Sequence, residues 1–299
     1  MENQEHEKHG KFEKFYNKNY KRLLIIPIAI LVFSFFYISI FYANNGDFIR
    51  KDFSLTGGTS VTLIGKINGD DLKHSLAGTL DEIDTRDIYD LSTGEKTALI
   101  VETKSDADTT KNALENYLGY TLNEKNSSFE FVGATLGENF YKQLTMAITF
   151  AFFFMALIVF FIFRSFVPSA AVIISAFADI FMTLVVVDII GLKVSAGGIV
   201  AFLMLIGYSV DTDILLTNRI LKRTEGTVNT KIFGAFKTGI MMSLTSALAV
   251  IFALLISRSF SSLLTQIFTI LTIGLGFDIF NTWITNASLL KWYVEGKKK

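Results

Sequence analysis

The sequence predicts an α-helical membrane protein with six transmembrane helices and an extracytoplasmic α+β domain between the first two. Two observations support this fold class: 51% of the 299 residues are hydrophobic against 19% charged, and the apolar residues form long uninterrupted runs. An average soluble domain has about 25% charged residues. The high hydrophobicity and the zero net charge also exclude a disordered chain or a nucleic-acid-binding protein.

Six apolar runs are long enough to cross a bilayer, which takes about 20 helical residues. We place them at about 23–42, 144–163, 167–190, 197–217, 232–256 and 262–290. The first run follows a basic segment, residues 1–22, but it is too long for a signal peptide, so we expect it to remain as an anchor. The later runs form a bundle over 144–290, followed by a basic tail at 291–299.

Basic residues are segregated along the chain. If the N-terminus lies in the cytosol, the short loops on the opposite side contain only Lys193 and Arg258, and the other flanking Lys and Arg are cytosolic. The positive-inside rule therefore predicts a multi-pass protein of the cell membrane with both termini cytosolic. Residues 43–143 would then be extracytoplasmic. Their acidic excess is typical of a solvated surface, since no calcium-loop spacing is present.

The extracytoplasmic region has a β-α-β-β-α-β pattern. Strands are predicted at 59–66, 84–91, 97–103 and 128–135, with a helix beginning near residue 68 and another at 106–118 that Ser105 caps. This order is that of the ferredoxin-like split β-α-β fold. Gly57 and Gly58 predict a tight backbone turn rather than a binding loop. The region has no nucleophile–base pair and no phosphate loop, which indicates a binding or gating role rather than catalysis.

Ionisable residues within the apolar runs are the main candidates for function. They are Asp179, Asp211, Asp213, Lys237 and Asp278. A charge at the centre of a bilayer costs roughly 2.5–3.5 kcal/mol, so we expect these side chains to face the protein interior.

Three of these carboxylates lie in polar stripes with helical spacing. The stripes are Ser175–Asp179–Thr183, Ser209–Asp213–Thr217, and Gly274–Asp278–Thr282 with Asn281 beside it. They predict a polar seam shared by three helices. The seam could relay protons or ions, or its hydrogen bonds could simply join the helices.

Lys237 lies at about the same depth in its run as Asp213. We therefore expect it to pair with Asp213 or Asp211 if the fourth and fifth helices adjoin. The alternative is that Lys237 extends toward the membrane interface instead.

Two motifs resemble the SecF branch of the SecD/SecF family: IGYSVDTDILLTNR at 206–219 and LTGGTS at 55–60. The likeness covers nearly the whole chain, and the VDTD run resembles the archaeal members. It implies a place in the resistance–nodulation–division superfamily and a SecD partner with six further helices. It also implies contact with the Sec translocon channel and a translocating polypeptide, with export driven by the proton-motive force.

Site residues can also be matched to the bacterial members of this family. Their Asp after the GYS motif corresponds to Thr212, which Asp211 and Asp213 flank here. Their functional Arg in the fifth helix corresponds to Met241, one turn from Lys237. The resemblance thus makes Lys237 the candidate for the cationic role.

Other classes of protein fit less well. An intramembrane aspartyl protease is disfavoured because Gly274–Asp278 is one residue too long for its GxGD motif, and because the only prolines, Pro27 and Pro168, do not form its Pro-Ala-Leu element. The chain has no Cys and only three scattered His, so we expect no metal site, no cofactor and no enzyme activity. A small-molecule transporter subunit of the same superfamily, or a scaffold subunit without ion coupling, remains an alternative.

Overall fold

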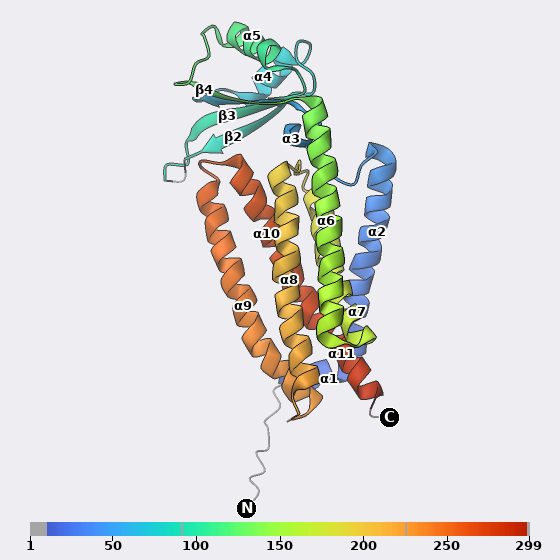
Figure 1. The fold of residues 1–299 in the computed structure, drawn as a ribbon. Coiled ribbons are helices and arrows are strands. Elements are labelled where there is room, and N and C mark those ends of the chain that lie inside the picture. The colour runs from blue at the N-terminus through green and yellow to red at the C-terminus, as the bar shows by residue number, and fades with distance from the viewer. Residues whose placement is uncertain (1–10, 91, 225, 298–299) are drawn as a thin grey trace, which may run out of the picture.

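The structure, a computed structural model, describes residues 11–90, 92–224 and 226–297. A helical bundle carries a small α/β domain on one end (Figure 1). The first and last described helices lie at the opposite end of the bundle (Figure 1). Parts of the predicted basic segments, at 1–10 and 298–299, and the predicted strand residue Leu91 lie outside the described residues.

Six helices are long and apolar enough to cross a membrane, which confirms the predicted number. The first combines α1 (Lys11–Leu23) and α2 (Ile25–Asn45), and the last combines α10 (Ser262–Phe280), η1 (Asn281–Asn286) and α11 (Ala287–Gly296). Between them lie α6 (Ala134–Phe163), α7 (Phe166–Ile189), α8 (Ala196–Lys222) and α9 (Val228–Ser257). The bounds of these six helices lie within about five residues of the predicted runs. The exceptions are the start of the first and second helices and the end of the last.

Two helices form the interior of the bundle. In α7 and α8, 56% of the most apolar stretch is buried, against 11–17% in α2, α6 and α9. The outer helices expose large aromatic side chains such as Phe161 and Phe252. Water would penalise so large an apolar surface, whereas lipid chains would not, so these outer faces suit a bilayer.

Helix α6 begins ten residues before the predicted start at 144. Its first turns leave the bundle and pack against α3 (Phe53–Thr56) beneath the domain (Figure 1). The contact is close because two glycines meet there: a Cβ on Gly137 would lie 2.7 Å from the backbone nitrogen of Gly57.

The domain contains the predicted β-α-β-β-α-β order of elements. These are β1 (Gly58–Ile64), α4 (Gly69–Leu76), β2 (Asp84–Tyr89), β3 (Lys96–Thr103), α5 (Ala107–Leu118) and β4 (Ser127–Val132). The strands pair in the order β2-β3-β1-β4, and every neighbouring pair is antiparallel. One expectation was wrong: Asp106 rather than Ser105 caps α5, because its carboxylate accepts the amides of Asp108 and Thr109.

The two domain helices cover only one face of the sheet (Figure 1). Val61, Leu99 and Val101 of the strands pack there against Leu72 and Leu114 of the helices, and all five are fully buried. The other face of the sheet looks toward the bundle.

A cavity of about 440 Å³ lies between this open face and the bundle, and its lining includes Asp52, Arg86, Glu102 and Gln266. Burial raises the pKa of Glu102 and the pKa of Asp52, although the nearby Arg86 guanidinium opposes both shifts.

The domain is also fastened to the bundle by a set of contacts that we call the outer joint, formed by residues 50–54, residues 193–196 and Gln266. Backbone hydrogen bonds join Val194 to Arg50 and Asp52, and the amide of Ala196 donates to the Ser54 hydroxyl at 2.9 Å. Gln266 of α10 accepts the amide of Ser195, the N-cap of α8, at 2.9 Å. The domain is therefore attached to α8 and α10 as well as to its covalent neighbours.

Candidate functional site: a buried carboxylate cluster

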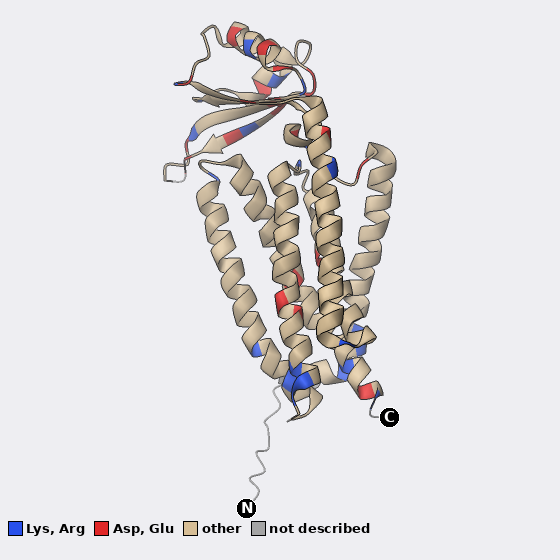
Figure 2. Cartoon of the chain, in the orientation of Figure 1, with Lys and Arg blue, Asp and Glu red and all other residues tan. Residues whose placement is uncertain are grey.

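Three carboxylates from three helices are buried within the bundle. Asp179 of α7 and Asp213 of α8 are 0% exposed, and Asp278 of α10 is 1% exposed. Figure 2 shows acidic residues midway along the helices, far from the charged ends of the bundle. We call Asp179, Asp213 and Asp278 the carboxylate cluster.

Asp179 joins three segments through hydrogen bonds. The Ser209 hydroxyl of α8 donates to its Oδ2 at 2.5 Å, and the Asn281 amide of η1 donates to its Oδ1 at 2.7 Å. Both partners belong to the polar stripes read from the sequence.

Asp213 and Asp278 extend the network. Oδ1 of Asp213 accepts from the Ser175 hydroxyl at 3.3 Å and from the Asn286 amide at 2.7 Å. Asp278 accepts from Thr282 at 3.3 Å and, at 3.5 Å, from Ser243 of α9. Members of all three predicted stripes thus take part in buried hydrogen bonds, which join α7 to α8, both of these helices to η1, and α9 to α10.

A single turn of π-helix allows the last span to serve two carboxylates. Asn281 and Asn286 are five residues apart, which in an α-helix would leave them about 140° apart around the axis. In a π-helix residue i bonds to i+5, so the two amides stack on one face. Segment η1 therefore presents Asn281 to Asp179 and Asn286 to Asp213.

The hydrogen-bond partners of the cluster among the described residues are neutral Ser, Thr and Asn side chains. Within the described ranges, no Lys or Arg forms an ion pair with any of its three carboxylates. A buried ionised carboxylate without a cation is very costly, so such a group needs a bound proton or a metal ion. The described part of the chain has no group of three acidic, His or Cys side chains placed to hold a metal ion.

The family model described as "Protein export membrane protein SecD/SecF, C-terminal" matches residues 111–296, which contain the whole cluster. The chain belongs to the SecD/SecF family. The protein-export membrane protein SecF of Methanocaldococcus jannaschii is 37% identical over 93% of this chain and 96% of the relative. SecF of Methanothermobacter thermautotrophicus is 38% identical over 93% of this chain and 94% of the relative.

A crystal structure of SecDF, a translocon-associated membrane protein from Thermus thermophilus, has the same fold. Its TM-score is 0.76 at 19% identity, over 98% of this chain. A second SecDF structure, in a super-membrane-facing form, gives 0.59 at 20% identity. This SecD/SecF family member spans only 39% and 38% of those longer chains.

Both motifs of the SecD/SecF resemblance can be located. The GYS-containing motif lies on α8, where Ser209 and Asp213 belong to the seam, and Thr212 is buried against α9 near Gly239. At the other motif Gly57 and Gly58 have φ values of +84° and +135°. A Cβ on either would overlap backbone atoms, so both positions require glycine.

The predicted pairing of Lys237 was wrong. Asp213 is enclosed by Ser175 and Asn286, whereas Lys237 and Asp211 are exposed on the outside of their helices. No ion pair or hydrogen bond joins Lys237 to another residue in the described ranges. Depth along a helix does not fix the direction of a side chain, and α9 turns Ala235 and Gly239 inward instead. Met241, the position matched to the bacterial Arg, is also exposed.

Three buried polar residues of this family member were missed from the sequence. The π-turn brings Asn286 to the seam, which an α-helical periodicity does not reveal. Ser243 reaches Asp278 from a helix whose polar stripe is short. Lys291, assigned to a basic tail, is 1% exposed and donates to Asn17 at 2.5 Å and Asn229 at 2.8 Å.

Proposed function

We propose that the chain is the SecF-type subunit of the Sec protein-export machinery and works beside a SecD subunit, the translocon channel and the translocating polypeptide. The relatives named SecF match over most of their length, which supports this role. The SecDF likeness covers less than half of the longer chain, so a SecD-like remainder would come from a separate subunit.

We further propose that both termini are cytosolic and that residues 43–143, with their ferredoxin-like domain, lie outside the cell membrane. Lys and Arg gather at the end of the bundle opposite the domain (Figure 2). The positive-inside rule assigns such an end to the cytosol. The same end carries the first and last described helices.

The carboxylate cluster is the proposed point of proton coupling, and the observation that carries this proposal is its burial with neutral partners alone. Polar atoms around Asp213 suggest a path by which protons could reach the cluster from the basic end of the bundle. Its Oδ2, Thr217 Oγ1 and Asn286 Oδ1 are buried and have no hydrogen-bond partner among the described residues. Buried polar atoms need partners, and ordered water is the partner that would also deliver a proton.

Proton binding at the cluster would change how the helices are held together. Asp179 and Asp213 accept hydrogen bonds from α7, α8 and η1, and each carboxyl group has more capacity to accept them when ionised than when protonated. One proton crossing about 150 mV supplies roughly 3.5 kcal/mol. That is comparable to the free energy of a few hydrogen bonds, which is enough to move a helix whose end lies in the outer joint.

The test uses vesicles that contain the chain, its SecD partner and the translocon channel, with export measured with and without a proton-motive force. We expect Asp213→Asn to remove the stimulation by the proton-motive force. Asp211→Asn, the same change two residues away on the exposed face of α8, should leave it intact.

Three results would count against the proposal. Full stimulation in Asp213→Asn would exclude Asp213 from coupling. Loss of the subunit complex in that variant, with export per assembled complex unchanged, would favour a scaffold. Stimulation by a sodium gradient after the proton gradient is collapsed would assign the cluster to sodium.

A further inference from the structure

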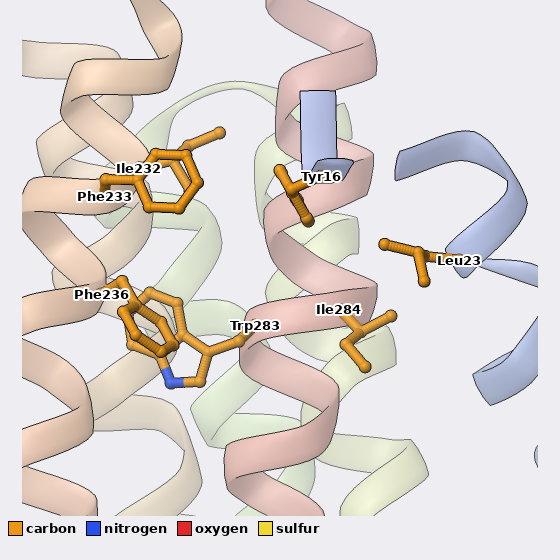
Figure 3. A pocket seen from close by; sticks show the side chains of 7 residues that line it. All are labelled: Tyr16, Leu23, Ile232, Phe233, Phe236, Trp283 and Ile284. Carbon is orange, nitrogen blue, oxygen red and sulfur yellow. The ribbon is translucent and has the colours of Figure 1, made fainter. Parts of the chain in front are cut away.

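An apolar cavity of about 160 Å³ is lined by residues of α1, α9 and η1, and no member of the carboxylate cluster lines it. Figure 3 shows its lining, which includes Tyr16, Leu23, Phe233, Phe236, Trp283 and Ile284. Aromatic rings form most of its wall: Tyr16 meets Phe233 edge-on at 6.1 Å, and Phe236 meets Trp283 at 5.0 Å. The lining therefore suits a hydrocarbon chain and offers almost nothing to a polar ligand.

Three segments that are distant in the sequence enclose this cavity. Tyr16 and Leu23 belong to α1, Phe233 and Phe236 lie in the first turns of α9, and Trp283 lies in η1. Helix α1 contacts both α9 and α11, so it lies across the basic ends of these helices. The cavity thus lies near the end of the bundle that α1 crosses.

Exposed cations lie close in the helices to residues that line the cavity. Lys237 follows Phe233 by one turn of α9 and is exposed, and within the described chain no carboxylate pairs with it. Side chains on a helix lean toward its N-terminus, so Lys237 leans past Phe233 toward the basic end. On the opposite wall, Lys21 and Arg22 are exposed directly before Leu23.

An apolar cavity beside exposed cations is complementary to an amphiphile with a negatively charged head. We propose that this cavity binds one membrane lipid with an anionic phosphate headgroup, its hydrocarbon chain against Phe236 and Trp283 and its phosphate at Lys237. The lipid gives Lys237 the anionic partner that the described chain does not provide. The inference requires neither proton coupling nor a particular orientation in the membrane.

The chain offers a direct probe, because it has only two tryptophans and one of them lines the cavity. Trp292→Phe removes the exposed tryptophan and leaves Trp283 as the only indole. The full-length variant would be placed in phosphatidylcholine vesicles that contain increasing fractions of a lipid with brominated chains, since bromine quenches indole fluorescence on contact. The brominated lipid is phosphatidylglycerol in one series and phosphatidylcholine in the other.

We expect Trp283 to be quenched by both lipids, with half-maximal quenching at an about fivefold lower fraction of phosphatidylglycerol. That ratio corresponds to about 1 kcal/mol, the usual effect of one Lys near an anionic surface. Lys237→Gln should bring the two curves together. Lys222→Gln removes the same charge from the exposed end of α8 and should leave the preference unchanged.

Filling the cavity gives a second test. Ile284→Phe should weaken quenching by both lipids, because the larger ring occupies the space of the chain. Coincident curves for the two lipids in the parent protein would overturn headgroup recognition. An equal loss of preference in Lys222→Gln would overturn the site at Lys237, and a Trp283 that neither lipid quenches would show that lipid does not enter the cavity.

Discussion

Gly57→Ala should loosen the domain from the bundle far more than an ordinary Gly→Ala change. Gly57 has φ +84° and ψ 160°, a region that essentially only glycine occupies, which costs other residues about 1–3 kcal/mol. The new Cβ would also lie 2.4 Å from Cα and 2.6 Å from the nitrogen of Ala134. Relieving this overlap means moving the backbone of α3 or α6, at a further cost of about 1–3 kcal/mol.

The matched control is Gly119→Ala, in the same domain. Gly119 has φ +75° at the end of α5, but a Cβ there would meet nothing within 4 Å. Gly119→Ala therefore costs only the free energy of placing an alanine in the left-handed conformation, about 1–2 kcal/mol. Because of the overlap and the more demanding conformation, Gly57→Ala should destabilise the attachment of the domain by about 3 kcal/mol more than Gly119→Ala does. That difference is a factor of about 100 in the equilibrium for opening.

Hydrogen exchange of the full-length protein in nanodiscs measures this difference. Amides of β1 and β3 should exchange about 100-fold faster in Gly57→Ala than in Gly119→Ala, while amides of α8 stay protected. Equal acceleration in the two variants would refute the close approach of Gly57 to α6 and leave only the backbone conformation to explain the glycine.

Two further predictions concern the opposite ends of the molecule. Burial raises the pKa of Glu102 and of Asp52 above their ordinary values of 4.5 and 3.8, so the folded domain favours their protonated forms. The protection of β3 amides from hydrogen exchange should therefore be greatest below about pH 4 and fall as the pH rises. Glu102→Gln should flatten this pH profile, and an unchanged profile would exclude Glu102 as a cause. Lys291→Met should remove the hydrogen bonds to the partly buried side-chain oxygens of Asn17 and Asn229, at about 1 kcal/mol each. The amides of α1 should then exchange faster while those of the domain do not. Full protection of α1 would contradict the role of Lys291 in holding it.

Hydropathy was sufficient to locate the six membrane helices because each needs a long apolar run. It failed at residues 134–143, where α6 leaves the bundle and its sequence, ATLGENFYKQ, becomes polar. The helix continues there because it packs against α3. Nothing in the local composition reveals that tertiary contact.

The carboxylate cluster was predictable for a similar reason. Polar residues at intervals of four point in one direction on a regular helix, and a buried carboxylate in each of three helices needs the same polar surroundings. The sequence did not reveal Asn286, because the π-turn breaks that periodicity. Lys237 was misplaced because its depth in the membrane was known but its direction around the helix was not.

Helix α8 connects the outer joint mechanically to the carboxylate cluster. Ser195 caps the helix at the joint, and Asp213 lies 18 residues further on, about 27 Å along the axis. A tilt of about 5° with its pivot at Asp213 would carry Ser195 sideways by about 2 Å. The hydrogen bond between Ala196 and Ser54 cannot stretch that far from its 2.9 Å and survive. Either the sheet travels with the end of α8 or the joint opens, so even a small rotation deep in the bundle is magnified into a displacement at the base of the domain.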